Sequence, residues 1–224
     1  MKKKLLGYYD YTVILTYCGM LFAFCGILRV MSQKYCDAVL CLMIAGVCDM
    51  FDGAVAATKT RTNSEKSFGI QIDSLSDLIS FGILPSVFVY MISGKNIFSG
   101  VIASLFVLCA LIRLAYFNVV EEERQKQTEE KRKSYLGVPV TTIAMLLPVV
   151  YLLYDYRICK KIICFPILLL LTGIGYVSPI EIRKPGVIGK TGIIILGILE
   201  VIVMVFFGRS GIHYGRLIRT VFFI

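Results

Sequence analysis

Charged side chains are scarce in this sequence. They make up 17% of the 224 residues, whereas 57% of the residues are hydrophobic and the mean hydropathy is +0.77. This composition excludes an ordinary soluble domain and favours a membrane protein with several spanning helices. The net charge of +9 does not indicate a nucleic-acid-binding protein, because the basic residues lie in short connectors and not in a continuous stripe. We therefore expect the lipid bilayer as a partner, and no nucleic acid.

Three other features are missing. The eight cysteines contain no C-x-x-C pair and mostly lie in apolar runs, so we expect neither a zinc site nor a disulfide framework. No small-residue cleavage site follows the basic residues near the N-terminus, so the first apolar segment is expected to remain as a membrane helix. No internal repeat is visible, which counts against transporter folds with repeat symmetry.

The apolar residues are grouped in long runs. A helix that crosses a membrane requires about 20 mostly apolar residues. Seven segments are candidates: residues 11–31, 36–57, 70–93, 97–118, 138–154, 162–178 and 187–207. The predicted fold is all-α, a polytopic membrane helical bundle of about six core transmembrane helices plus one or two additional C-terminal helices. We expect one domain over residues 1–224, with residues 211–224 too short to span.

The distribution of lysine and arginine predicts the orientation in the membrane. With the N-terminus in the cytosol, the inner connectors hold thirteen of these residues and the outer ones hold eight, and basic connectors usually stay on the cytosolic side. Residues 119–136 form the longest inner connector, and their mixed charge predicts a solvated cytosolic loop, helical or mobile. The connector at residues 58–67 would also face the cytosol.

Four aspartates lie in two pairs on either side of that second connector. Asp49 and Asp52 are three residues apart, and Asp73 and Asp77 are four apart, so each pair shares one face of its helix. Carboxylates beside membrane-grade apolar runs are costly, and such a cluster is a functional-site hypothesis. Two neighbouring helices could point all four into one small volume. Ligands that are all oxygen suit magnesium, manganese or calcium.

Residues 49–77 resemble the signature of the CDP-alcohol phosphotransferase family, D-x-x-D-G-x-x-A followed by G-x-x-x-D-x-x-x-D. The matching positions are Asp49, Asp52, Gly53, Ala56, Gly69, Asp73 and Asp77. The resemblance covers about residues 8–185 and implies a membrane transferase of phospholipid biosynthesis. Residues 68–82, 113–118 and 137–141 are similar to the branch that transfers the phosphatidyl group of CDP-diacylglycerol to L-serine, which gives phosphatidylserine and CMP.

The resemblance also implies roles for the acidic residues. Asp49, Asp52 and Asp73 would hold a divalent metal, Mg²⁺ or Mn²⁺. Asp77 would be the general base for the serine hydroxyl and would share in metal binding. Metal ions that bridge carboxylates to phosphate oxygens neutralise the charge that develops as CMP leaves. We favour direct attack by serine, because no histidine or cysteine nucleophile accompanies the aspartates.

The nucleotide and its phosphates are expected to contact the residues around the connector. Gly53, Ala56 and Gly69 would let the nucleotide approach the backbone. The family pattern has an arginine directly after the alanine, but here that position is Ala57, and eleven residues follow it before Gly69, three more than in the family pattern. Lys59 or Arg61 could supply the missing cation.

Several alternatives remain open at this level. Arg113 is either a snorkelling side chain at the membrane interface or a guanidinium that holds the serine carboxylate or a lipid phosphate. The acceptor could instead be glycerol phosphate or inositol phosphate. A divalent-cation transporter is a rival of another class, although no polar path continues across the membrane. A homodimer is a candidate assembly. We expect a bacterial or archaeal cell membrane, and the bias of lysine and arginine favours an active site that faces the cytoplasm.

Overall fold

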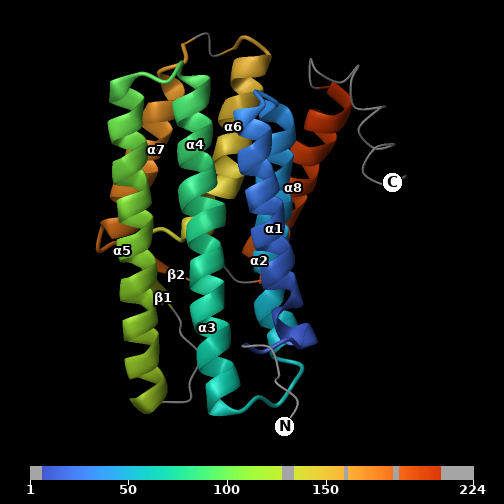
Figure 1. Ribbon diagram of the computed structural model, residues 1–224, viewed down its shortest axis with the longest axis vertical. Coiled ribbons are helices and arrows are strands. Elements are labelled where there is room, and N and C mark those ends of the chain that lie inside the picture. Colours follow the sequence, from blue (N-terminus) through green and yellow to red (C-terminus); the bar gives the residue numbers. More distant parts are fainter. Residues whose placement is uncertain (1–6, 128–133, 159–160, 184–186, 208–224) are drawn as a thin grey trace.

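The computed structural model describes residues 7–127, 134–158, 161–183 and 187–207, and in this part of the chain it is a bundle of upright helices (Figure 1). The helices are α1 (Tyr11–Met31), α2 (Tyr35–Ala56), α3 (Asn63–Asp77), α4 (Leu84–Ile92), α5 (Ile97–Gln127), α6 (Ile143–Asp155), α7 (Cys164–Val177) and α8 (Val187–Phe207). The predicted all-α fold is therefore confirmed. Residues 211–224 lie outside the described part.

Helix length separates two groups of apolar segments. Four stretches are long and apolar enough to cross a membrane: Tyr11–Met31, Tyr35–Ala56, Asn63–Ile92 and Ile97–Glu123. Three others are shorter: Val140–Asp155, Cys164–Val177 and Ile195–Met204. The expectation of an integral membrane protein agrees with these helices, whereas the number of about six spans stays a prediction.

The helix with the second aspartate pair begins earlier than predicted. We expected it at residue 70, but α3 begins at Asn63, because Thr62 and Glu65 form a capping box. The Glu65 carboxylate accepts the Thr62 backbone N–H at 2.7 Å, and the Glu65 backbone N–H donates to the Thr62 hydroxyl at 3.3 Å. A π-helical turn (Leu78–Ile83) follows directly after Asp77 and leads into α4. Such turns inside helices are frequent at functional sites.

The first part of the connector predicted over residues 119–136 is helical, one of the two forms expected for it. Helix α5 continues through Gln127, since the charged residues after the apolar run are good helix formers. Strand β1 (Ser134–Leu136) then pairs antiparallel with β2 (Glu181–Arg183), and Tyr135 lies opposite Ile182. This short pair ties the segment before α6 to the segment after α7.

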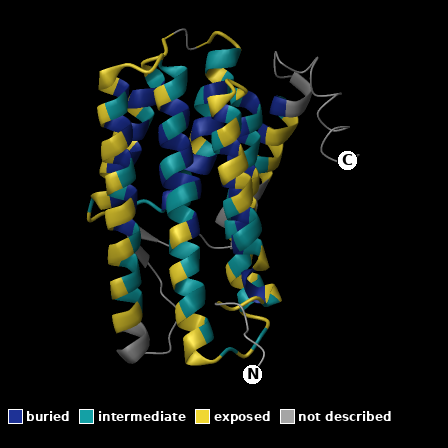
Figure 2. Cartoon of the chain, in the orientation of Figure 1, coloured by how far each residue is buried: buried dark blue, intermediate teal, exposed yellow. Residues whose placement is uncertain are grey.

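Small residues let α1 pack closely on its neighbours. A Cβ atom added to Gly26 would lie 2.9 Å from Leu84 Cδ2 and 3.1 Å from Cys41 Cβ, so no larger side chain fits between these helices. The apolar core contains fully buried aromatic side chains, among them Phe81 and Phe106. Figure 2 shows buried residues concentrated in the half of the bundle away from the α2–α3 connector, while the helix ends near that connector are more accessible.

One expectation about the cysteines is wrong. Cys164, at the start of α7, is disulfide-bonded, although the spacing of the cysteines predicted no disulfide. Six others, Cys18, Cys25, Cys36, Cys41, Cys48 and Cys109, are free thiols. The start of α7 lies at the end of the bundle opposite the α2–α3 connector (Figure 1).

Candidate functional site

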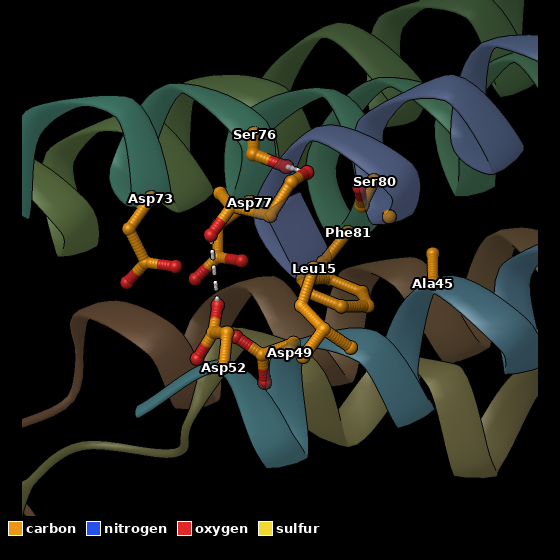
Figure 3. A pocket seen from close by; sticks show the side chains of 11 residues that line it. Leu15, Ala45, Asp49, Asp52, Asp73, Ser76, Asp77, Ser80 and Phe81 are labelled. Atoms are coloured by element: carbon orange, nitrogen blue, oxygen red, sulfur yellow. Dashed lines mark hydrogen bonds between the residues drawn. The ribbon is translucent and has the colours of Figure 1, made fainter. Parts of the chain in front are cut away.

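The two aspartate pairs meet between α2 and α3, as their spacing predicted. Figure 3 shows Asp73 and Asp77 on one helix pointing toward Asp49 and Asp52 on the other. One carboxylate oxygen from each of Asp49, Asp52 and Asp73 lies within 4.8 Å of the other two. The carboxyl group of Asp77 lies within hydrogen-bonding reach of Asp49. The helices thus bring three close carboxylates together and set a fourth beside them.

The four aspartates line a cavity of about 10 Å³, close to the room that one water molecule or ion requires. The Asp73 Oδ1 atom is buried and accepts no hydrogen bond within the described part of the chain. An unpaired buried carboxylate oxygen is costly unless a cation or proton compensates it. An all-carboxylate donor set with an open oxygen fits Mg²⁺ or Mn²⁺, which prefer oxygen ligands.

Hydroxyl groups connect this cluster to helices that carry none of the aspartates. The Thr16 hydroxyl on α1 donates to Asp52 Oδ2 at 3.3 Å, and the Ser76 hydroxyl on α3 donates to the Thr16 carbonyl at 3.3 Å. On the other side of α3, the Ser74 hydroxyl donates to Asn118 Oδ1 on α5 at 3.0 Å. We assigned no role to these four residues from the sequence. Their closeness in sequence to the aspartates was the available signal for the two serines.

The two signature glycines have different surroundings. A Cβ atom on Gly53 would meet no atom within 4 Å, so the end of α2 is open there, next to the half-buried Ala56 and exposed Ala57. A Cβ atom on Gly69 would lie 3.0 Å from Arg61 Nη1. Gly53 therefore leaves free space, and Gly69 leaves the space that the Arg61 guanidinium uses.

Lys59 is bound by two acidic residues, one before α1 and one in the first turn of α3. Its Nζ lies 2.7 Å from Asp10 Oδ2 and 3.3 Å from Glu65 Oε1. Asp10 caps α1 by accepting the Thr12 backbone N–H at 2.9 Å. The hydrogen bond from Lys59, together with those from Thr12, lowers the pKa of Asp10 to about 2. The residues before α1 are thereby tied to the connector between α2 and α3.

Arg113 is buried, with 7% of its surface exposed. Its Nη2 donates to the Gly137 carbonyl at 3.3 Å, and its guanidinium lies 5.9 Å from the centre of the Phe117 ring. A snorkelling side chain would reach the surface, so this arrangement does not fit that alternative. The guanidinium is instead directed into the bundle, beside the turn that precedes α6.

A second cavity adjoins the aspartate cluster. It has about 110 Å³, lies between α1 and the helix of Asp73 and Asp77, and is lined mainly by apolar side chains such as Met20, Ile72 and Ile79. Thr16 and Ser76 line both cavities. An apolar space beside a charged one suits a ligand with a hydrocarbon part and a polar part.

Three relatives resemble this chain over parts of their length. A protein from Saccharomyces cerevisiae named CDP-diacylglycerol–serine O-phosphatidyltransferase is 38% identical over 112 residues, 49% of this chain and 40% of the yeast protein. A Bacillus subtilis protein of the same name is 27% identical over 168 residues, 72% of this chain and 83% of that protein. An archaetidylserine synthase from Methanothermobacter thermautotrophicus is 32% identical over 116 residues, 51% of this chain and 46% of that protein.

A family model also matches well over half of the chain. The model of the CDP-alcohol phosphatidyltransferases covers residues 11–177. That range runs from the start of α1 to the end of α7 and contains both aspartate pairs. The chain therefore belongs to the CDP-alcohol phosphatidyltransferase family.

Proposed function

We propose that this protein transfers the phosphatidyl group of CDP-diacylglycerol to the hydroxyl of L-serine, producing phosphatidylserine and CMP. The observation that carries the proposal is the convergence of the Asp49, Asp52 and Asp73 carboxylates within 4.8 Å in a chain of this family. The names of the yeast and Bacillus relatives support serine as the acceptor. The apolar cavity beside the cluster supports a lipid-linked donor.

Asp49, Asp52 and Asp73 would hold Mg²⁺ or Mn²⁺. The metal would neutralise charge on the phosphates of the donor. Thr16 keeps the Asp52 carboxylate oriented through its hydrogen bond. These residues bind and orient, and none of them has to carry a proton during the transfer.

Asp77 would be the general base and would share in metal binding. It would take the proton of the serine hydroxyl as that oxygen attacks the phosphorus atom of the phosphatidyl group. The bond between this phosphorus and the bridging oxygen of the diphosphate breaks, and CMP leaves with that oxygen. Asp77 lines the same cavity as the other three aspartates, which supports a place for it beside the reacting groups.

Substrate binding would involve residues around the cluster. Gly53, Ala56 and Gly69 would border the nucleotide, and either Lys59 or Arg61 of the connector would supply the cation that binds its phosphates. Arg113 would hold the serine carboxylate or a lipid phosphate. Its burial would strengthen a bidentate contact with such an anion.

The site would face the cytoplasm. The bias of lysine and arginine supports this orientation. The disulfide of Cys164 supports it as well, because disulfides persist in oxidising compartments and Cys164 lies at the end of the bundle away from the connector. The protein would reside in a bacterial or archaeal cell membrane, with a homodimer as the candidate assembly.

The decisive experiment measures CMP release from CDP-diacylglycerol by the purified full-length protein in lipid nanodiscs. Serine, glycerol 3-phosphate and inositol phosphate are supplied in turn. Metal ions are first removed with a chelator, and Mg²⁺ or Mn²⁺ is then added in increasing concentration. We expect release that requires both serine and metal. CMP release that requires glycerol 3-phosphate or inositol phosphate would show that this compound, and not serine, is the acceptor. Cation flux through sealed vesicles without CMP release would indicate a transporter.

A further inference from the structure

We propose that Arg61, and not Lys59, is the cation of this chain that binds the diphosphate of the CDP-linked substrate. The inference rests on the proposed function only for the chemical class of the ligand. From the sequence, Lys59 and Arg61 are equally good candidates for this role, because both lie in the same connector. The structure gives these two residues different surroundings.

Arg61 lies against the helix that carries the second aspartate pair. Its Nη1 is within 3.0 Å of the position that a Cβ atom on Gly69 would occupy. Gly69 and Asp73 are four residues apart on α3, so they share one face, about one helical turn of 5.4 Å from each other. The guanidinium is thus placed about one turn from a candidate metal ligand. A phosphate held by a metal at Asp73 would be in its neighbourhood.

Lys59 has the opposite arrangement. Its ammonium group is held by Asp10 at 2.7 Å and by Glu65 at 3.3 Å. Binding a phosphate would require Lys59 to give up these partners. Among the residues that the structure describes, Arg61 forms no ion pair with a carboxylate. Its positive charge is therefore available to an anionic ligand, whereas that of Lys59 is already compensated.

The chemistry of the ligand favours arginine at this position. A guanidinium presents parallel N–H donors that match two phosphate oxygens, and it remains charged at every relevant pH. Ala57, at the end of α2, offers only an exposed methyl group. The connector after it carries Arg61 across to α3. The cation thus approaches from the side of Gly69, where no side chain fills the space.

The test measures binding of CDP to the purified full-length protein with Mn²⁺ present, by calorimetry, so that no acceptor is needed. Arg61→Met should weaken CDP binding about tenfold, as expected for one lost charge-assisted contact. Cytidine, which has no phosphate, should bind both proteins equally. Lys66→Met, which removes an exposed positive charge from the same end of α3, is the matched control and should leave CDP binding unchanged. Thermal unfolding of each variant confirms that it folds.

A rescue experiment provides the second criterion. Adding Ala57→Arg to Arg61→Met should restore most of the CDP affinity, because it supplies a guanidinium from the end of α2. A larger loss of CDP affinity in Lys59→Met than in Arg61→Met would overturn the inference, as would an unchanged affinity in a folded Arg61→Met protein. If serine proves not to be the acceptor, the CDP results still decide the role of Arg61. Failure of the proposed acceptor and failure of this inference are therefore distinguishable.

Discussion

The Thr16 hydroxyl on α1 donates a hydrogen bond of 3.3 Å to Asp52 Oδ2 on α2. The Thr16 carbonyl also accepts the Ser76 hydroxyl of α3 at 3.3 Å. One residue of a helix without acidic side chains thus contacts both helices that carry the aspartates. The geometry of the carboxylate cluster depends on this third helix.

Thr16→Val should lower serine-dependent CMP release about tenfold and raise the metal concentration that gives half-maximal activity. Valine keeps the branched shape but loses the hydroxyl, and a hydrogen bond to a charged group is worth about 1.5–3 kcal/mol. A metal titration of the initial rate measures both effects. The control is Thr172→Val on α7, whose hydroxyl donates to the Leu168 carbonyl of its own helix at 2.7 Å. Equal losses of activity in the two variants would show that Thr16 has no specific role at the carboxylate cluster.

Asp77→Asn should abolish phosphatidyl transfer while metal and CDP still bind, because the amide cannot accept the serine proton. CMP release measures transfer, and calorimetry with Mn²⁺ and CDP measures binding. Asp37→Asn changes an acidic residue in the first turn of α2, at the opposite end of that helix from the cluster, and should keep its activity. Near-normal turnover by the Asp77 variant would exclude Asp77 as the base.

Gly69→Ala should weaken CDP binding severalfold, because its Cβ would lie 3.0 Å from Arg61 Nη1 and the guanidinium would have to shift by a few tenths of an ångström. The measurement is a double-mutant cycle with Arg61→Met. If Gly69 acts by making room for Arg61, then Gly69→Ala has little further effect once residue 61 is methionine. Fully additive losses would show that Gly69 acts independently of Arg61.

Gly137→Ala should destabilise the protein by about 1–3 kcal/mol, the usual range for backbone strain of this kind. Gly137 has a φ of +74°, and an added Cβ would lie 2.8 Å from the Tyr176 carbonyl oxygen. The apparent unfolding temperature in detergent should fall accordingly. Gly192→Ala on α8 is the control, because an added Cβ there meets no atom within 4 Å, and alanine favours a helix. An unchanged unfolding temperature for Gly137→Ala would contradict this prediction.

The contribution of Asp10 to stability should depend on pH in a defined window. Folding lowers the pKa of Asp10 from 3.8 to about 2. A lowered folded-state pKa stabilises the protein above 3.8, and this stabilisation is lost as the pH falls towards 2. Asp10→Asn keeps a capping residue but loses the charge, so the difference in unfolding temperature between the two proteins should shrink through this window. A difference in unfolding temperature that stays constant through this window would show that the ion pair with Lys59 is not its cause.

Local patterns explain what could be predicted. The long apolar runs predicted the helices, and the spacing within each aspartate pair predicted that its two members share one helix face. Both predictions depend only on residues that are close in sequence. The capping box of Thr62 and Glu65 was equally local, and it would have placed the start of α3 correctly. The extension of α5 into its charged segment agrees with the helical form expected for part of residues 119–136, because glutamate and lysine are good helix formers.

By itself, the sequence determined that this is a helical membrane protein with two acidic pairs beside one connector. Only the tertiary structure decided which distant residues meet those pairs. Thr16 lies 36 residues before Asp52, and Asp10 lies 49 residues before Lys59, so no local period connects them. The physical reason is that these contacts form only after the helices pack. The distances between side chains from different parts of the chain then determine which basic residues form ion pairs with carboxylates. In this way Lys59 is paired, and Arg61 is left available beside Gly69.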